Sequence, residues 1–571
     1  MRPLLLTQLL FIWALLSPPT TLAGTRLSGE LREAGGGSLP LAQVFLSGLT
    51  GDPSKAVISA TASPDGTFAL EVPGPGLYRL WLAAPGYIPQ NYPIAVEAAE
   101  KSLTLKATLI PYRYREQLEK VRIIGSWNQY KARDAQPMQA QPDGTWVYER
   151  AATEEQVGYQ LLGVEATGRS IPGTEADSYT VDSGGDFQSQ LKTREGRVRI
   201  VFEPAKLLRS PAAGQGRIEF DRKHAHLLRL IRLTSEAAES QHKAFSAYQA
   251  HARQSGGAAA PFQFSHGTLP RTLLTTMRNS RNPLFLRQGA ALLLLGLPFH
   301  ERKEGERGTA LVTEVLELVP PDSLLWALHA SAVSSIPMLV PQGSLEALLR
   351  EFVNRNPDRN VQVTALGALF MASPTVDEAA LSARSKELEP YAKDIPYAKS
   401  LLMQFSPERK TAKGKPVPAF ALKLLEGDKE VSREALAGRF YLIDFWATWC
   451  APCVADMGRL HAVWEKFEGR GGFTILSVSL DREAETVAKF RDGPWKMPWL
   501  NAHAAEGVES SVAQAFEVSY LPRFILVDPQ GVIVGSDREL SHGLERTLES
   551  ILPEAEHRKD EGPSESASHL N

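Results

Sequence analysis

Residues 440–453 read FYLIDFWATWCAPC, and this stretch decides the fold of the C-terminal part of the chain. Its first half is almost wholly apolar, which is typical of a strand buried on both faces, and its end is a CxxC motif that opens the helical run Val454–Phe467. A helix N-terminus carries partial positive charge, so it lowers the pKa of Cys450 and favours the thiolate that attacks disulfides. Cys453, one turn later on the same helix, is expected to resolve the mixed disulfide.

The residues that follow alternate between helical and strand patterns. Alternation of this kind predicts an α/β fold with parallel strand pairing. The expected order is the strand Phe473–Leu480, the helix Glu483–Phe490, the helical stretch Val508–Phe516, the strand Phe524–Val527, a turn at Asp528–Gly531 and the strand Val532–Val534.

This C-terminal pattern resembles the thioredoxin superfamily, and within it the TlpA/ResA-type thiol–disulfide oxidoreductases. Besides the CxxC with Trp449 before it, the resemblance rests on Pro416–Phe420 and on the extra helical segment at 506–516. It covers residues 415–553 and implies a thioredoxin fold and disulfide exchange with proteins. No cofactor is expected.

The resemblance also assigns roles to single residues. Pro522 matches the family's cis-proline, which faces the CxxC and leaves backbone groups free to pair with a substrate strand. It is followed by Arg523, where threonine is common, so substrate contacts are expected to differ there. Asp444 matches a buried acid that assists proton transfer at Cys453, although many TlpA-type members carry asparagine.

Three other interpretations of the CxxC each lack support in the sequence. A zinc site would need His461 and one more ligand, because two thiolates cannot complete a tetrahedral site. A static disulfide in a degenerate fold is disfavoured by Trp449, Pro452 and Pro522. A peroxiredoxin would need its cysteine in a threonine-containing loop.

Whole-chain counts narrow the protein class. At 571 residues the chain is long enough for about four domains, and 43% hydrophobic with 22% charged residues is typical of a soluble globular protein. The net charge of −3 provides no basic field for nucleic acid. Only two cysteines are present, which excludes a disulfide-rich scaffold or a cysteine-rich metal site.

The N-terminus predicts export. One positive charge, the apolar run Leu4–Leu16 and the small-residue end at Ala23 match a signal peptide over residues 1–23. An uncleaved interfacial anchor is the alternative, since the run is too short to span a membrane. No later stretch reaches spanning length. The expected location is the periplasm or cell envelope of a bacterium.

Residues 24–110 contain short β-type runs separated by glycine and proline, which suggests a small β-sandwich. Ser63–Phe68, followed by Gly76–Tyr78, resembles the carboxypeptidase regulatory-like domain, which implies a spacer or adhesive module.

Residues 117–203 are a second β-rich unit, in which Val121–Asn128, Asp143–Trp146 and Gly158–Leu161 come in that order. This arrangement resembles the glycogen- and starch-binding type of carbohydrate module. That resemblance implies glycan contact through aromatic rings, although Tyr130 stands where the family often has tryptophan. Trp127 and Trp146 are instead expected in the core of a sandwich under the simpler interpretation.

Residues 218–405 have helical patterns. Pro283, Pro321 and Pro357 recur at intervals of 36–38 residues, which suggests stacked helical hairpins, while an irregular bundle is the alternative. The polar tail at 554–571 is expected to be disordered.

These features together predict an exported protein-disulfide reductase, acting in cytochrome c maturation or envelope disulfide repair. The CxxC holds every thiol of the chain, so a separate thiol protein must recycle it. The alternative is a glycan- or protein-binding factor with an accessory redox domain. The direction of electron flow depends on the reduction potential.

Overall fold

A computed structural model of the chain describes residues 24–552, with gaps at 34, 38, 40, 50–54, 208, 210–215, 255–261, 299–305, 373–377, 428, 494, 538–539 and 541–542. The predicted signal peptide at 1–23 and the predicted disordered tail at 554–571 lie outside the described residues. Within the described part, no helix is long and apolar enough to cross a membrane.

The described chain forms two compact units. One contains residues up to 236 together with 271–294 and 317–329, and the other contains the remaining helices and the C-terminal sheet. The central helices are therefore divided between the two units.

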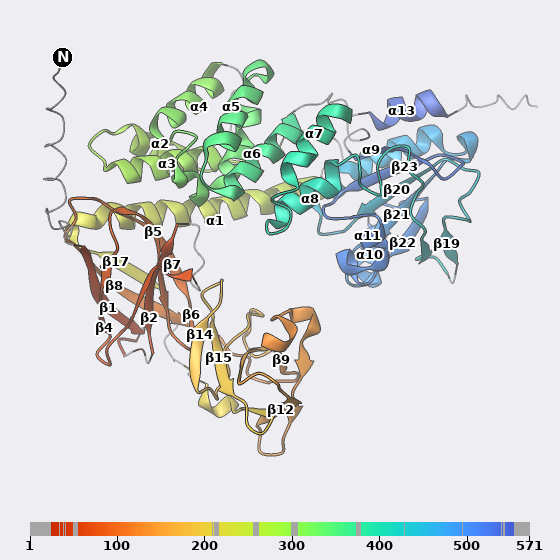
Figure 1. Ribbon diagram of the computed structural model, residues 1–571. Helices are drawn as coiled ribbons and strands as arrows, with labels where there is room; N and C mark the ends of the chain where they lie inside the picture. Colours follow the sequence, from red (N-terminus) through yellow and green to blue (C-terminus); the bar gives the residue numbers. More distant parts are fainter. Residues whose placement is uncertain are drawn as a thin grey trace, which may run out of the picture. The chain divides into compact units, whose positions relative to one another are not determined.

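The first unit begins with two sheets (Figure 1). One sheet has the order β17-β8-β1-β4 with β6 beside β8, and the other has the order β3-β2-β5-β7. The strands are β1 Thr25–Glu33, β2 Gln43–Gly48, β3 Ile58–Thr61, β4 Thr67–Val72, β5 Gly76–Ala83, β6 Tyr87–Ile88, β7 Gln90–Val96, β8 Ser102–Pro111 and β17 Arg217–Phe220. Alternate residues of β4 and β8 are buried, as expected for strands with one face on a core.

Two further sheets follow in the same unit, with orders β10-β9-β13-β15-β14 and β11-β12-β16. Their strands are β9 Arg122–Gly125, β10 Gln136–Pro137, β11 Gln139–Ala140, β12 Trp146–Ala151, β13 Gln156–Leu162, β14 Ser178–Val181, β15 Phe187–Lys192 and β16 Arg197–Phe202. The two sheets share one buried cluster that includes Ile123, Tyr159 and Phe202.

Helices occupy the middle of the chain. They are α1 Ala225–Gln254, α2 Leu269–Arg278, α3 Leu284–Gly296, α4 Glu306–Leu318, α5 Gln342–Arg355, α6 Arg359–Ala372, α7 Glu378–Leu388 and α8 Pro396–Phe405, with 3-10 segments at Leu324–Leu328 and Ala330–Met338. One face of α5 is apolar and packed: Leu345, Leu349 and Phe352, spaced three or four residues apart, are buried. The array-like arrangement of these helices stays a prediction, as do the domain boundaries.

The C-terminal part has a five-stranded sheet with the order β22-β21-β20-β23-β24. The strands are β20 Tyr441–Trp446, β21 Thr474–Ser479, β22 Leu500–His503, β23 Arg523–Val527 and β24 Ile533–Ser536, and a small hairpin, β18 Ala421–Lys423 with β19 Glu430–Ser432, precedes them. β22, β21 and β20 pair in parallel, as predicted. β23 runs antiparallel to β20, and β24 runs antiparallel to β23. The short turn at 528–531 joins these two strands directly, which only an antiparallel pair permits.

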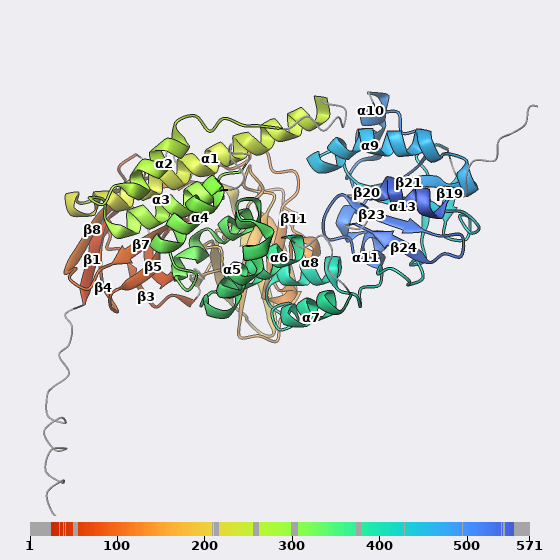
Figure 2. The same ribbon diagram turned by 90° about the horizontal axis from the view of Figure 1, so that it is seen from above.

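Helices cover both faces of this sheet. They are α9 Ala451–Phe467, α10 Ala484–Asp492, α11 Ser511–Ala515 and α13 Leu544–Ile551. One buried cluster joins α9, α10 and α13 to one face, and another joins α11 and Val417–Leu436 to the opposite face. Figures 1 and 2 both show α9 and α11 on opposite sides of the strands. Every residue of β20 is buried, because both faces of this central strand are covered.

Candidate active site

The two cysteines lie where the central strand gives way to a helix. β20 ends at Trp446 and α9 begins at Ala451, with Cys450 as its N-cap. Cys450 and Cys453 form a disulfide of 2.07 Å, and both side chains are buried, at 5% and 2% exposure. The Sγ of Cys450 accepts a hydrogen bond from the backbone N–H of Cys453 at 3.2 Å. The same N–H and the helix dipole would stabilise a thiolate at Cys450 after reduction.

A buried acid holds the turn between β20 and α9. Asp481 accepts hydrogen bonds from the backbone N–H of Thr448 at 3.0 Å and from its Oγ1 at 2.7 Å. Ser479 donates to the same carboxylate at 2.8 Å, and His503 Nε2 lies 2.7 Å from the Asp481 carbonyl oxygen. Sequence reasoning missed Asp481. Its position just after β21 was the available signal, because the carboxyl ends of parallel strands meet at one edge.

Pro522 lies at this same edge of the sheet. The Leu521–Pro522 peptide bond is cis, and β23 begins at the next residue. β20 and β23 are antiparallel and pair Phe445 with Arg523, so the register brings Pro522 opposite Trp446, four residues before Cys450. Trp449 is 54% exposed, beside the buried disulfide.

Asp444 lies on the face of β20 that is covered by α9. Its neighbours on that face, Leu442 and Trp446, belong to the buried cluster that contains both cysteines. Asp444 is fully buried, and burial raises its pKa. A hydrogen bond from Ser477 Oγ to its Oδ2, at 2.9 Å, lowers the pKa in part, and the resulting value is about 7. Such a carboxyl can both give and take a proton near neutral pH.

Arg523 points to the opposite face of the sheet. Its guanidinium is fully buried, forms an ion pair with Asp537, and donates to Thr411 Oγ1, to Tyr520 Oη at 3.0 Å and to the Phe516 carbonyl at 3.1 Å. Burial raises the pKa of Asp537, and Arg523 opposes that rise. Sequence reasoning noted Arg523 as a departure from the family but did not anticipate its buried partners.

The geometry of this region can be compared with known proteins. The model of the AhpC/TSA family matches residues 413–536. Residues 413–536 form a thioredoxin-fold domain of this family. The thiol–disulfide oxidoreductase ResA of Bacillus cereus is 27% identical over 151 residues, covering 26% of this chain and 84% of the relative. ResA of Bacillus subtilis is 26% identical over 130 residues, covering 23% of this chain and 69% of the relative.

A solved structure is also similar to the thioredoxin-fold domain. It is the thioredoxin domain of a thiol–disulfide oxidoreductase from Bacteroides vulgatus, 28% identical, covering 25% of this chain and 99% of that chain, with a TM-score of 0.23. Since the ResA relatives are thiol–disulfide oxidoreductases, the predicted class of thiol–disulfide oxidoreductase is confirmed. The resemblances noted for residues 24–110 and 117–203 stay predictions.

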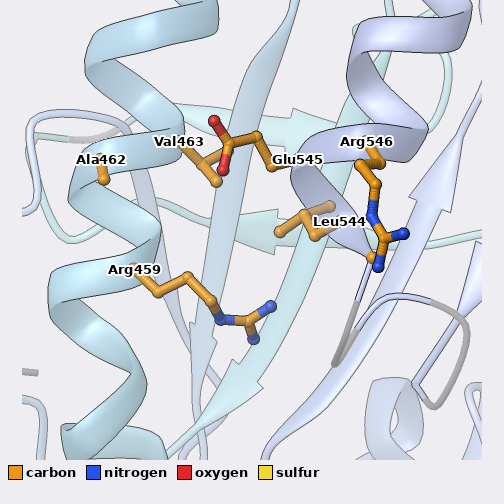
Figure 3. A pocket seen from close by; sticks show the side chains of 7 residues that line it. Arg459, Ala462, Val463, Leu544, Glu545 and Arg546 are labelled. Carbon is orange, nitrogen blue, oxygen red and sulfur yellow. The ribbon is translucent and has the colours of Figure 1, made fainter. Parts of the chain in front are cut away.

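One pocket of the C-terminal part of the chain lies between α9 and the start of α13. Its volume is ≈ 220 Å³, and Figure 3 shows Arg459, Ala462 and Val463 on one helix and Leu544, Glu545 and Arg546 on the other. Neither cysteine lines it. Among the described residues, no group of three or more His, Cys, Asp or Glu side chains could hold a metal ion.

The aromatic residues of 117–203 that were considered for glycan contact are Trp127, Trp146 and Tyr130. Trp127 and Trp146 are half-buried against the core of this unit. The ring of Trp127 stacks on Tyr148 with centroids 5.6 Å apart, and the guanidinium of Arg150 lies 4.9 Å from the Trp127 ring. Tyr130 packs its hydroxyl against Gly158. Core packing therefore accounts for part, but not all, of the surface of these rings.

Proposed function

We propose that Cys450 and Cys453 exchange disulfides with protein substrates. The observation that carries this proposal is the bonded pair at the N-terminus of α9, with the Cys453 N–H directed at Cys450 Sγ. In the reduced protein, the Cys450 thiolate attacks a substrate disulfide and forms a mixed disulfide. Cys453 then attacks Cys450 Sγ, releases the reduced substrate and restores the internal disulfide.

Three neighbours complete the proposed site. Asp444 exchanges a proton with Cys453, for which a pKa of about 7 is suited. Pro522 lacks an N–H, and the resemblance to thioredoxins implies that the backbone beside it pairs with an extended substrate segment. Trp449, which is exposed next to Cys450, offers an apolar contact to that segment.

We propose that the protein is exported and works in the reducing direction, in cytochrome c maturation or envelope disulfide repair. The signal-like N-terminus and the similarity to ResA support this placement. A separate thiol protein recycles Cys450 and Cys453, because the chain has no other cysteine. A redox titration of the Cys450–Cys453 pair tests the direction. A reduction potential of about −120 mV, as in a strong oxidant, would contradict a reductase.

Trapping tests the exchange itself. The variant Cys453→Ser keeps the attacking sulfur but cannot resolve the mixed disulfide, so it is expected to accumulate covalent adducts with substrate proteins that reducing agent releases. Cys450→Ser is the matched control and should capture none through the same route. Equal capture by both variants, or none by Cys453→Ser while the wild type reduces insulin, would contradict the proposed order of attack.

A second proposed activity is glycan contact through residues 117–203. A pocket of ≈ 390 Å³ beside Tyr148 favours it, because its lining combines an aromatic ring with Gln139, Gln141, Glu149 and Arg199. Sugar rings have apolar C–H faces and polar hydroxyls that suit this combination. Loss of starch or glycogen retention in Tyr148→Ala, with retention kept in Tyr179→Ala, would support it; no retention of the wild type would contradict it.

A further inference from the structure

A buried hydrogen-bond chain leads from Trp499 to Asp444. The indole Nε1–H of Trp499, in the segment just before β22, donates to Ser477 Oγ at 2.9 Å, and Ser477 Oγ donates to Asp444 Oδ2 at 2.9 Å. Ser477 and Asp444 are fully buried, and Trp499 is 6% exposed. The other oxygen of Asp444, Oδ1, is also buried and has no hydrogen-bond partner among the described residues.

The chemistry of the three groups fixes the direction of this chain. An indole N–H is only a donor, so Ser477 Oγ must be the acceptor of the first bond. The single hydroxyl proton of Ser477 is then left for Asp444 Oδ2. Since Oδ2 is occupied as an acceptor, a proton on the Asp444 carboxyl belongs on Oδ1.

We propose that Ser477 and Trp499 are positioning residues that hold Asp444 with Oδ1 as its proton-exchanging oxygen. This inference rests on the proposed function of Cys450 and Cys453. When a thiolate of the recycling protein attacks Cys450 Sγ, the Cys450–Cys453 bond breaks and Cys453 leaves with the bonding electron pair as a thiolate. The proton on Asp444 Oδ1 passes to that sulfur, leaving a thiol and a carboxylate. During substrate reduction the carboxylate takes the proton back as Cys453 attacks.

The surroundings of Asp444 make Ser477 the group that can be varied most cleanly. Burial is the largest influence on the pKa of Asp444 and raises it, and the Ser477 hydrogen bond is the largest influence that lowers it. On α9, Asp456 raises the pKa and Arg459 lowers it. His461 on the same helix packs against Trp499, and burial lowers its own pKa. β20, β23 and α13 contribute six apolar side chains to the buried cluster on this face: Leu442, Trp446, Phe524, Leu526, Leu544 and Leu548.

Trp495 provides a matched control for Trp499. Both tryptophans belong to the same buried cluster and both contact His461, with ring centroids 5.3 Å and 4.9 Å away. Their exposures are similar, at 8% and 6%. Only Trp499 donates to Ser477, whereas the Nε1 of Trp495 is buried without a partner among the described residues. Replacing either by phenylalanine removes an N–H and part of a ring from the same core.

The test measures how fast dithiothreitol reduces the disulfide of the full-length protein between pH 5 and 9. Quenching with an alkylating agent and counting labels by mass spectrometry gives the rate, and the chain has no other thiol to interfere. Dividing each rate by that of Asp444→Asn isolates the inflection that belongs to Asp444. Loss of one hydrogen bond to a carboxylate corresponds to about one pKa unit.

We expect Ser477→Ala to move the inflection upward by about one pH unit, and Ser477→Thr, which keeps the hydroxyl, to move it back toward the wild-type value. Trp499→Phe should move it upward by less than Ser477→Ala, and Trp495→Phe should leave it unchanged. An unshifted inflection in Ser477→Ala, or equal shifts in the two tryptophan variants, would overturn the inference. So would a wild-type profile identical to that of Asp444→Asn.

The same set of proteins separates this inference from the proposed function. If the wild type shows an inflection that Asp444→Asn abolishes and Cys453→Ser still traps substrates, an unshifted Ser477→Ala refutes only the positioning role. If Cys453→Ser traps nothing and the wild type does not reduce insulin, the proposed function itself fails. Thermal unfolding of each variant identifies a loss of fold, and Ser477→Thr and Trp499→Phe give the answer should Ser477→Ala not fold.

Discussion

Asp481 binds Thr448 through two hydrogen bonds, and Thr448 lies two residues before the attacking cysteine proposed here, Cys450. The carboxylate is 3% exposed and is also bound by Ser479. The turn between β20 and α9 is thus fastened to the end of the neighbouring parallel strand. This anchor fixes where α9 begins and, with it, the position of the disulfide.

Removing this anchor should impair both stability and exchange. In Asp481→Ala, the backbone N–H and the hydroxyl of Thr448 lose a buried charged acceptor, so we expect a loss of about 2–3 kcal/mol in the free energy of unfolding. The turn would also loosen, and insulin reduction should fall several-fold.

Asp528→Ala is the matched control for this change. Asp528 accepts the backbone N–H groups of Gln530 and Val532, at 2.9 and 2.8 Å, in the hairpin turn between β23 and β24. It should lower stability while leaving insulin reduction near the wild-type rate. Full activity of folded Asp481→Ala would contradict the anchoring role.

Asp444 should make stability depend on pH. Its pKa is about 7 in the folded protein against 3.8 for an unperturbed carboxyl, so the folded state binds one proton more between these values. Stability must therefore fall as pH rises from about 4 to 7. Asp444→Asn removes this loss. The free energy of unfolding of the oxidised variant minus that of the oxidised wild type should therefore be larger at pH 8 than at pH 4, by up to about 4 kcal/mol.

Chemical unfolding of the oxidised wild type and of oxidised Asp444→Asn at pH 4, 6 and 8 measures this effect. The oxidised form is used because disulfide-bonded cysteines do not titrate and so add no pH dependence of their own. The difference between the two proteins should grow between pH 4 and 7 and then level off. A difference that is the same at every pH would show that Asp444 keeps an ordinary pKa in the folded protein.

The sequence was informative about local patterns and much less about contacts over long separations. The strand, turn and helix around residues 440–467 follow from an apolar run and a helix start, and the structure has β20 and α9 there. The short strand β22 and the helix α13 were not predicted, since four and eight residues carry little periodic signal.

The supporting contacts of the site were not predictable in the same way. Ser477 lies 33 residues from Asp444, and Thr411 lies 112 residues from Arg523. Such pairs are set by sheet register and by the layer that covers each face, neither of which leaves a repeating pattern in one sequence. The family motif supplied Asp444 and Pro522 as candidates, but it contained nothing about the groups that hold them.

Arg523 and Asp537 should contribute stability only as a pair. Both are buried, at 0% and 8% exposure, so removing one leaves the other charged and unpaired in the core. Arg523→Met is expected to lower the free energy of unfolding by about 3–5 kcal/mol, and Arg523→Met combined with Asp537→Leu should recover most of that loss.

The exposed pair Lys489 and Glu485, at 74% and 77% exposure, is the control for Arg523 and Asp537. Lys489→Ala should change stability by less than about 0.5 kcal/mol, because solvent screens such pairs. If the double variant at Arg523 and Asp537 is no more stable than Arg523→Met, the loss comes from the packing of the arginine and its hydrogen bonds to Thr411, Tyr520 and Phe516, and not from an unpaired charge.

Trp449 should matter for protein substrates and not for folding. Its ring is 54% exposed and directly precedes Cys450, so Trp449→Ala removes an apolar contact beside the sulfur without opening a cavity in the core. We expect stability within about 0.5 kcal/mol of the wild type and a drop of about tenfold in kcat/KM for insulin, which corresponds to about 1.4 kcal/mol of lost substrate contact. Val508→Ala, at another exposed apolar residue of the same domain, should leave insulin reduction unchanged.

Dithiothreitol is too small to reach the ring and the sulfur together, so its reaction with the disulfide should keep the wild-type rate in Trp449→Ala. An equal loss toward dithiothreitol and insulin would instead assign Trp449 to the chemistry of Cys450 itself.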